Sequence, residues 1–467
     1  MKKAGFDQKN EILRRVEGLL EIAALTVMYY ITWRMYYRVY DTHAFLGRGK
    51  FVLVGIYFLL MLFMFTFLEG FRYGYLKLSD VVISQWLSIL VVNFITYFQL
   101  GLISAVMQYV VPFLVLTAAE FLVAFLCSFV CSKIYHRFSS SQHLLMVYGT
   151  DKAINLKVKM DAHGDMYNVE KFIHCDEGLE NICREAEKFD AVILNDIPAT
   201  VRNDVLKFCY EKRILTYVVP KISDIIIKGA ENITLYDTPL FLVNARGLSY
   251  SQKLIKRGMD IVLTLIALIP GLVIMGITAI AIKLGDGGPV FFRQERVTID
   301  GRVFSIIKFR SMVVDADKIQ TPHMAENDDP RITKVGRVIR KFRIDELPQL
   351  FNILKGEMSI VGPRPERCEH VEKYTAEIPE FVYRNSVKAG LTGYAQVYGK
   401  YNTTAYDKLR LDLIYIENYS FVLDIKLIFL TFQTMFHAES TEGADVAAEM
   451  EKRSEEILAE IREEKNS

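Results

Sequence analysis

The chain has few cysteines and almost no net charge. Its six cysteines form no Cys-x-x-Cys pair and none of the usual Cys/His ligand spacings, so the sequence predicts neither a disulfide framework nor a structural zinc motif. Reduced thiols in a protein that faces the cytoplasm fit this usage best. The 56 Lys and Arg residues are balanced by 55 Asp and Glu residues, which gives no overall attraction for nucleic acid. Any site for an anionic ligand must therefore be local.

A Gly-x-Gly-x-x-Gly dinucleotide motif is also absent from the segment where an α/β domain is expected. Between residues 138 and 250, short β-type runs alternate with helical patterns, which predicts a Rossmann-like α/β domain. The first strand leads into Gly149-Thr150-Asp151-Lys152, which lacks the glycine spacing that lets a backbone approach a pyrophosphate. A regulatory or oligomerisation role is therefore favoured over dinucleotide binding. The expected strands are His143–Tyr148, Ala191–Leu194, Leu215–Val219 and Leu240–Val243.

Long apolar runs are confined to two parts of the chain, and four of them lie in the first 137 residues. They cover approximately 17–37, 51–71, 81–104 and 108–132, each near the roughly 20 residues that a helix needs to cross a bilayer. We expect four transmembrane helices and no cleavable signal peptide. Basic residues before the first run place the N-terminus in the cytoplasm, and an even number of spans keeps the remainder there. Glu120 lies within the fourth run, where a neutral, hydrogen-bonded carboxyl is favoured over a direct functional role.

A fifth apolar run, about 254–284, is interrupted by Pro270-Gly271. Proline removes a helix hydrogen bond and clashes with the preceding turn, so a break is expected there. Basic residues flank both ends, which favours both ends on the cytoplasmic side. The run is interpreted as a re-entrant membrane helix. The alternative, a kinked fifth span, would place everything after residue 285 away from cytoplasmic nucleotides.

Two adjacent carboxylates, Asp345 and Glu346, follow a basic run that includes Arg340 and Arg343. Pro348 suits the first turn of a helix, where the positive end of the helix dipole keeps a carboxylate ionised. An ionised carboxylate can attack phosphorus when cations neutralise the phosphoryl oxygens, and two carboxylates can hold a divalent metal. On composition alone, a solvated acidic helix start explains the pair equally well.

Basic side chains on either side of this pair could supply those cations. A predicted strand hairpin, joined through Asp300-Gly301, leads to Lys308 and Arg310. Two residues apart on a strand, these cations would point to the same face and could hold two phosphates. Downstream, Gly362-Pro363-Arg364-Pro365 predicts a rigid turn that presents Arg364 for bidentate phosphate contact.

In this order, the motifs resemble those of the bacterial sugar transferases, the monotopic polyprenyl-phosphate phosphoglycosyl transferases. The resemblance covers about residues 251–437, and the N-terminal helices and α/β segment are similar to the large subtype, which starts exopolysaccharide, capsule or O-antigen assembly. Thr298, Ala389 and Tyr394 stand where the family commonly has Gly, Pro and a smaller or different apolar residue. The matching blocks are Lys256-Arg257-Gly258-Met259-Asp260, Gly287 to Phe292, Lys308 to Met312, Asp345 to Asn352, Val361 to Pro365 and Gly390 to Val397.

The resemblance implies a ping-pong transfer of a hexose 1-phosphate from a UDP-sugar to polyprenyl (undecaprenyl) phosphate. Asp345 would attack the sugar-bearing phosphate, release UMP and carry the phosphosugar until polyprenyl phosphate takes it. Glu346 would assist, with Mg²⁺ held by Asp345 and Glu346. The residues expected to bind substrate are Lys308, Arg310, Arg340, Arg343, Pro363, Arg364 and Gln396, and those expected in the re-entrant element are Lys256, Arg257, Asp260 and Pro270.

The predicted fold class is a membrane protein of α plus α/β type. It comprises a four-helix transmembrane domain (1–137), the Rossmann-like domain (138–250), a mostly helical catalytic domain (251–437) and a charged tail (438–467). The expected location is the bacterial inner membrane, with the catalytic domain on the cytoplasmic face. Membrane lipids and a second copy of the chain are the expected partners, and nucleic acid is not.

Two other functions stay open at this point: a membrane-anchored nucleotide-sugar sensor or scaffold without catalysis, and a metal-dependent phosphohydrolase. The acidic pair is intact, which disfavours the sensor. The sequence does not identify the sugar or the exact role of Glu346.

Overall fold

The computed structural model describes residues 3–37, 49–73, 78–138, 142–150, 154–161, 167–243, 247–314, 331–399 and 403–435, with residues 452, 453, 456, 457 and 459 of the tail. The chain divides into two compact units. The first comprises Met1–Val219 with Met450–Ser467, and the second Pro220–Glu449. Most of the predicted charged tail lies outside the described residues, but Ile457 is buried against Ile154 and Val158.

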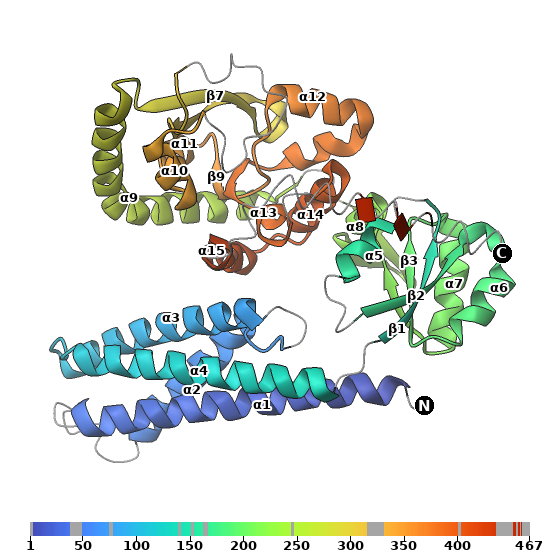
Figure 1. Ribbon diagram of the computed structural model, residues 1–467, viewed down its shortest axis with the longest axis horizontal. Coiled ribbons are helices and arrows are strands. Elements are labelled where there is room, and N and C mark those ends of the chain that lie inside the picture. The colour runs from blue at the N-terminus through green and yellow to red at the C-terminus, as the bar shows by residue number, and fades with distance from the viewer. Residues whose placement is uncertain are drawn as a thin grey trace. The chain divides into compact units, whose positions relative to one another are not determined.

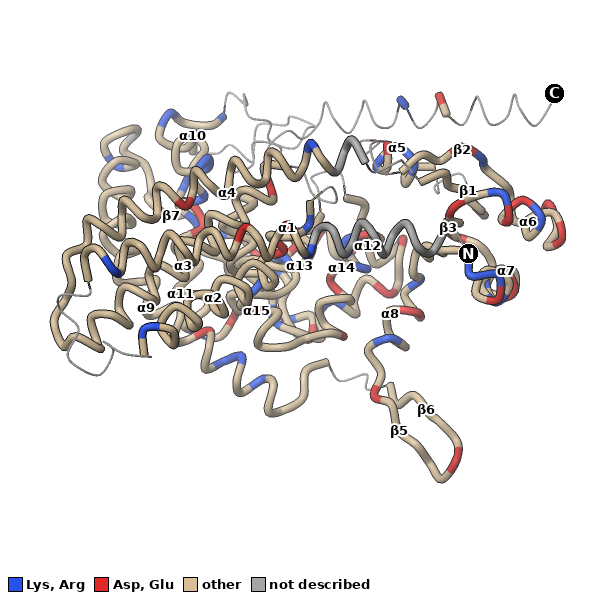
Figure 2. Tube along the Cα trace, turned by 90° about the horizontal axis from the view of Figure 1, so that it is seen from below, with Lys and Arg blue, Asp and Glu red and all other residues tan. Residues whose placement is uncertain are grey.

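Four long apolar helices begin the first unit (Figure 1). They are α1 (Lys3–Thr32, continued by the π-helical turn Trp33–Tyr37), α2 (Gly49–Phe67), α3 (Leu78–Ser104) and α4 (Val111–Phe138). Together with Tyr250–Gly285, these give five helices within the described residues that are long and apolar enough to cross a membrane. Figure 2 shows few charged positions along α1–α4. The expectation of long membrane-type helices is confirmed, whereas the number of spans stays a prediction.

Polar side chains inside this helical bundle are hydrogen-bonded to one another. Glu120 on α4 accepts from the Tyr57 hydroxyl and from Asn93 Nδ2, each at 2.7 Å. A second buried carboxyl, Glu21, accepts from the Tyr73 hydroxyl and from Gln85 Nε2. Glu120 is thus bonded to two other helices, the arrangement favoured for it above, because an unpartnered polar group in an apolar interior costs several kcal/mol.

A parallel four-stranded sheet in the order β2-β1-β3-β4 completes the first unit. Its central strands are almost wholly buried, and helices pack on both faces: α6 and α7 on one and α5 on the other. The α/β part of the predicted fold class is confirmed. The elements are β1 (Gln142–Tyr148), α5 (Ile154–Asp161), β2 (Tyr167–His174), a 3₁₀ turn (Cys175–Glu177), α6 (Leu179–Ala186), β3 (Ala191–Asn195), α7 (Ala199–Glu211) and β4 (Leu215–Val218).

The second unit begins with α8 (Ile222–Lys228) and the antiparallel hairpin β5 (Glu231–Leu235) and β6 (Thr238–Leu242). The expected strand at Leu240–Val243 therefore exists, but it pairs in this hairpin rather than in the parallel sheet. Ile222 and Ile225 of α8 are buried in the core of the second unit with Leu409 and Leu413.

Helix α9 (Tyr250–Asp286) contains Pro270 and continues through it. Figure 1 shows its ribbon turning sharply partway along its length. The sequence predicts a break at Pro270-Gly271, but the helix is not interrupted there, because the backbone is helical on both sides of the proline without a gap. A bend that preserves the helix is a usual response to a missing hydrogen bond and a ring clash.

The remaining elements pack around one core that includes Leu350, Ile353, Val361, Phe381 and Leu427. The predicted strand hairpin is present as β7 and β8, and β9 pairs in parallel with β10. The elements are β7 (Phe291–Val297), a 3₁₀ turn (Ile299–Gly301), β8 (Val303–Phe309), α10 (Lys334–Lys341), the 3₁₀ turn η8 (Ile344–Glu346), α11 (Gln349–Lys355), β9 (Ser359–Val361), α12 (Cys368–Glu377), a 3₁₀ segment (Pro379–Ser386), β10 (Gly390–Thr392), α13 (Tyr394–Tyr398), α14 (Ala405–Glu417) and α15 (Phe421–Met435).

Candidate active site

The carboxylates Asp345 and Glu346 lie on η8, between α10 and α11. Thr333 caps the start of helix α10, and its Oγ1 accepts from Gly336 N at 2.9 Å. At Gly336, a Cβ atom would lie only 1.9 Å from the Ser311 carbonyl oxygen, so glycine lets α10 pack directly against the segment that follows β8. This close packing brings the acid pair near the end of β8. Figure 2 shows Lys and Arg positions gathered on α10.

Arg343 sets the direction of the turn that carries the acid pair. Its φ of 53° and ψ of 24° lie in the left-handed region, which costs a non-glycine residue about 1 kcal/mol or more. The residue lies between α10 and η8, just before the turn, and Glu346 N donates to its carbonyl oxygen at 3.2 Å. Such strain is often found where a backbone is held for function.

Three cations surround the Glu346 carboxylate. Lys308 Nζ on β8 lies 3.1 Å from Oε1, Arg364 Nη2 lies 3.7 Å from Oε1, and Arg343 Nη1 lies 3.9 Å from Oε2. The Glu346 side chain is only 13% exposed, whereas those of Arg343 and Arg364 are 45% exposed. The two guanidinium groups thus have surface left for a further anion.

The two neighbouring carboxyl groups have pKa values shifted in opposite directions. Burial and the adjacent Glu346 charge raise the pKa of Asp345 to about 6, against the effect of Lys308, Arg340 and Arg343. Burial also acts to raise the pKa of Glu346, but Lys308, Arg364 and Arg343 outweigh it and lower the value to about 2. At neutral pH Glu346 is therefore fixed as an anion, and Asp345 is ionised but basic for a carboxylate.

Backbone hydrogen bonds hold the Gly362-Pro363-Arg364-Pro365 turn. Gly362 N donates to Thr392 O at 2.8 Å, and Pro363 O accepts from Gly390 N at 2.9 Å. Arg364 O accepts from Arg384 Nη2 at 3.0 Å, and the same guanidinium pairs with the buried Asp412 carboxylate at 2.7 Å. Pro363 therefore acts through the backbone, and Arg364 is presented from a fixed turn.

Positive charge is concentrated around this turn. Arg296 Nη1 on β7 donates to Pro365 O at 3.2 Å. Burial and the charges of Arg367 and Arg364 lower the pKa of Arg296 to about 10. The predicted basic surroundings of the acid pair thus extend beyond the residues chosen from the sequence.

The other predicted substrate-binding residues have different positions. Arg310 is buried and its Nε donates to Pro289 O at 2.7 Å, which ties its guanidinium to the backbone just before β7. Arg340 lies on α10 close enough to Asp345 to lower the pKa of that carboxyl. Gln396 lies on α13, and its Nε2 donates to Leu391 O at 3.2 Å. The structure thus brings Lys308, Arg340, Arg343 and Arg364 around the acid pair.

The residues assigned to the start of the re-entrant element are interior anchors. Lys256 Nζ lies 2.6 Å from Asp424 Oδ2 and donates to the Tyr415 hydroxyl at 2.9 Å. Arg257 donates to the carbonyl oxygens of Ile353 and Leu354 at 2.6 and 2.7 Å, near the C-terminus of α11. Asp260 Oδ1 accepts from Ser359 Oγ and Ile360 N. These bonds fix the first half of α9 to α11, β9, α14 and α15.

Sequence reasoning missed the ion pair of Arg384 and Asp412 and the position of Arg296. Arg384 and Asp412 are each less than 5% exposed, and 28 residues separate them. No local spacing signals such a pair, because its partners meet only in the folded chain.

The residues present fit a divalent cation at the acid pair. Mg²⁺ is usually held by one or two carboxylates together with water and substrate phosphate oxygens. Asp345 and Glu346 Oε2 could provide these carboxylate oxygens. The nearest cation that pairs with Glu346 Oε2 is 3.9 Å away.

Comparisons with known proteins point to one family. The bacterial sugar transferase profile matches residues 251–438. The chain is 46% identical over 184 residues to the UDP-N-acetylgalactosamine-undecaprenyl-phosphate N-acetylgalactosaminephosphotransferase of Aeromonas hydrophila, which covers 39% of this chain and 43% of that protein. It is 43% identical over 211 residues to the UDP-glucose:undecaprenyl-phosphate glucose-1-phosphate transferase of Escherichia coli K12, covering 44% of this chain and 43% of the relative.

A shorter relative is matched over most of its length. The uncharacterized sugar transferase EpsL of Bacillus subtilis is 39% identical over 186 residues, or 40% of this chain and 89% of the relative. The match to the two longer relatives spans less than half of their length. The family profile covers the segment that contains the acid pair.

Proposed function

This chain belongs to the bacterial sugar transferase family, and we propose that it transfers a hexose 1-phosphate from a UDP-sugar to polyprenyl phosphate. Relatives named for the transfer of glucose, galactose or N-acetylgalactosamine groups are 43–46% identical to this chain over about 180–210 residues. The proposal rests chiefly on one observation: Lys308, Arg343 and Arg364 surround the carboxylate of Glu346, the neighbour of Asp345. Burial raises the pKa of Asp345 while these cations lower that of Glu346, and such a split assigns different roles to two similar groups.

Asp345 is the proposed nucleophile. With a pKa of about 6 it is about nine-tenths ionised at pH 7, and it is more basic than an ordinary carboxylate. One of its oxygens attacks the phosphorus that bears the sugar. The bond from that phosphorus to the bridging oxygen breaks, and UMP leaves with the electron pair. A polyprenyl phosphate oxygen then attacks the same phosphorus, which frees Asp345 and forms the polyprenyl diphosphate sugar.

Glu346 is the proposed organiser of the cations. As a fixed anion it holds Lys308, Arg343 and Arg364, and their remaining N–H groups can face phosphate oxygens. Preorganised donors of this kind stabilise charge that develops in the transition state. When bound by Asp345 and Glu346, Mg²⁺ would neutralise diphosphate charge. The exact duty of Glu346 beyond this is part of the proposal.

We also propose that α9 enters and leaves the membrane on the cytoplasmic side. Lys256, near its start, pairs with Asp424, and Gly285, near its end, lies beside Val335, where an added Cβ would be 3.7 Å from Val335 Cγ2. Along a straight helix these positions would be about 44 Å apart, more than the thickness of a bilayer core. Since both contact the same compact unit, a bent, re-entrant helix accommodates them on one side. This would place the site where a soluble nucleotide sugar and a lipid phosphate meet, at the inner membrane of a bacterium.

The test is UMP release by the purified full-length chain from a panel of UDP-sugars, with and without polyprenyl phosphate. We expect turnover only with the lipid phosphate, and a phosphosugar adduct on the peptide that contains Asp345 when the lipid is left out. Asp345→Asn should abolish both, whereas Asp300→Asn, on the exposed hairpin turn, should not.

The alternatives give other products. Water as acceptor, with free sugar phosphate formed regardless of the lipid, would identify a phosphohydrolase. Binding of UDP-sugars with no UMP release from any of them would favour a sensor. Wild-type turnover by Asp345→Asn would exclude the covalent mechanism.

A further inference from the structure

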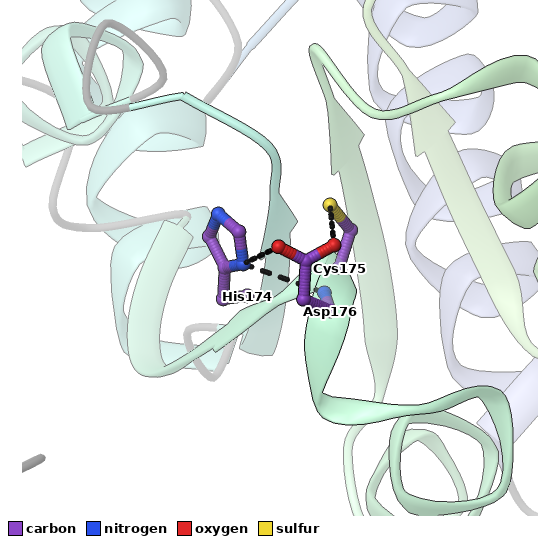
Figure 3. Close-up of side chains that lie close together, drawn as sticks. All are labelled: His174, Cys175 and Asp176. Carbon is purple, nitrogen blue, oxygen red and sulfur yellow. Dashed lines mark hydrogen bonds and ion pairs between the residues drawn. The ribbon is translucent and has the colours of Figure 1, made fainter.

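Three potential metal ligands follow one another at the end of β2. His174 is the last residue of the strand, and Cys175 and Asp176 begin the 3₁₀ turn that leads to α6. Within the part of the chain that the structure describes, they form the one group of three His, Cys, Asp or Glu residues whose ligand atoms all lie within 4.8 Å of one another. Figure 3 shows the Asp176 carboxylate between the imidazole and the thiol.

Two of the separations, each to a different oxygen of the Asp176 carboxylate, are close to those between neighbouring ligands of one tetrahedral ion. His174 Nδ1 lies 3.3 Å from Asp176 Oδ2, and Cys175 Sγ lies 3.7 Å from Asp176 Oδ1. Zinc bonds of about 2.0–2.3 Å to nitrogen, oxygen and sulfur place neighbouring tetrahedral ligands roughly 3.3–3.7 Å apart. An ion could thus be bound with small side-chain movements.

The hydrogen bonds of His174 put its lone pair on Nδ1, which an ion would reach by displacing the long bond from Asp176 N. Nε2 lies 3.3 Å from the Gly149 carbonyl oxygen, which can only accept, so Nε2 carries the proton. Asp176 N donates to Nδ1 at 3.3 Å, which agrees with a lone pair on Nδ1. A metal-binding histidine commonly donates its second N–H to a backbone carbonyl, and this fixes the tautomer and the ring orientation.

Local capping explains only part of this arrangement. His174 caps the 3₁₀ turn, and Glu177 Oε1 accepts from His174 N at 3.1 Å. The cap accounts for the backbone path but requires neither the thiol nor the carboxylate of Asp176. The side-chain contacts among the three residues are long, so an ion would replace weak interactions. Glu177 would keep its own bond to the backbone.

We propose that His174, Cys175 and Asp176 bind a zinc-class divalent ion, with the fourth position open to solvent. A nitrogen and a sulfur ligand favour such an ion over Mg²⁺ or Ca²⁺. Binding releases the thiol proton to water and leaves a thiolate on the metal. The Asp176 side chain is 85% exposed, so the open position faces water or an incoming ligand.

The position in the sheet suits a ligand site. In parallel α/β sheets, ligands bind beyond the carboxyl ends of the strands, where the strand order reverses. In the order β2-β1-β3-β4 this reversal lies between β1 and β3. Gly149 follows β1 and contacts His174, and Thr150 donates to Asp196 after β3 at 2.6 Å. The site is therefore next to the edge at which this domain would bind a ligand.

The test uses the full-length chain in detergent, with Zn²⁺ and Co²⁺ as the probes. We expect one thiolate-bound ion per chain, seen as a thiolate-to-cobalt absorption band. Cys175→Ser should remove the band, and Asp176→Asn should weaken cobalt binding at least tenfold. Asp176 is exposed, so that variant should fold normally, as circular dichroism can check.

Two matched controls come from the same domain. His143→Asn alters a histidine that pairs with Glu170 on the neighbouring strand, and Cys209→Ser alters another buried cysteine. Both should keep the band at the intensity of the wild type. The proposal is overturned if the wild-type chain binds no cobalt through a thiolate, or if folded Cys175→Ser and Asp176→Asn variants bind cobalt as the wild type does.

Discussion

Lys308 Nζ donates to Glu346 Oε1 at 3.1 Å, and this contact joins the end of β8 to η8. It is the shortest of the three cation contacts of Glu346, and the Lys308 charge is the largest of the influences that lower the pKa of that carboxyl. The strand hairpin and the acid pair therefore form one electrostatic unit rather than two neighbouring motifs.

Replacing Lys308 with Met should reduce kcat for UMP release by about 100-fold or more, because a preorganised cation of this kind is commonly worth that much in the transition state. Lys308→Arg should keep part of the activity. The control is Arg302→Met, which removes a cation from the exposed end of the same hairpin. Equal loss in the two Met variants would show that the hairpin, and not the Lys308 charge, is responsible.

Removing the Asp345 charge should stabilise the fold while it abolishes turnover. In the folded chain the pKa of Asp345 is raised, so folding favours the protonated carboxyl. This contribution to stability is fully present below the ordinary pKa of an aspartate and is lost as pH rises through about 6. At pH 7, Asp345→Asn should therefore raise the unfolding free energy by about 1–3 kcal/mol. Thermal unfolding in detergent can measure this, and the gain should shrink toward pH 4.

Glu346→Gln is the control of opposite sign. Its pKa is lowered, so the ionised carboxylate contributes stability that is present above its ordinary pKa and lost as pH falls toward 2. Gln cannot neutralise the three cations. At pH 7 the thermal unfolding midpoint of this variant should therefore be lower than that of the wild type. The same direction of change in both variants would contradict the split between the two carboxyl groups.

The rate of the first half-reaction should depend on pH through Asp345. Its ionised form is the nucleophile, and its pKa is about 6, so kcat/KM for the UDP-sugar should fall by half near pH 6 and about tenfold by pH 5. Glu346 has a pKa of about 2, so its titration does not change the rate in this pH range. A flat profile down to pH 4.5 would show that Asp345 is not the titrating nucleophile.

Topology can be tested by thiol labelling in cells. In a background without the six native cysteines, Arg302→Cys places a thiol on the exposed hairpin after α9. A re-entrant α9 predicts that a membrane-impermeant reagent reaches this thiol only after the membrane is opened. Val106→Cys, in the exposed turn between α3 and α4, should be labelled in intact cells. Labelling of Arg302→Cys in intact cells would show that α9 crosses the membrane.

Features encoded over short stretches of sequence could be predicted. Apolar runs located α2, α3 and the strands β1, β3 and β4 to within a few residues, and they covered most of α4 and the apolar part of α1. Strands β1 and β3 each bury a continuous segment, whereas β4 is exposed or half-buried along its length. Strand β2 was missed, since only Val169 and Ile173 are buried in it. The order of short motifs was sufficient to identify the family.

Long-range polar contacts could not be predicted. Lys256 looked like a charge at the membrane boundary, but it reaches Asp424, 168 residues away. Arg310 was expected to share a face with Lys308, yet its guanidinium is folded back onto Pro289. The orientation of a buried cation depends on which acceptor the tertiary structure brings near it, and local spacing carries no such information.

Thr298 and Ala389, two of the positions that depart from the family pattern, contact each other. The buried Thr298 Oγ1 donates to Glu357 O at 3.0 Å and accepts from Ala389 N at 3.1 Å. A proline at residue 389 would have no N–H to satisfy, so the threonine hydroxyl provides the acceptor that alanine requires.

Thr298→Val keeps the shape of the side chain but leaves a buried donor and a buried acceptor unsatisfied, which should lower the unfolding free energy by about 1–3 kcal/mol. Adding Ala389→Pro should recover part of this loss, because the unsatisfied N–H is removed. A thermodynamic cycle of the two single variants and the double variant measures the coupling. Additive effects of the two substitutions would show that the hydroxyl does not compensate for the missing proline.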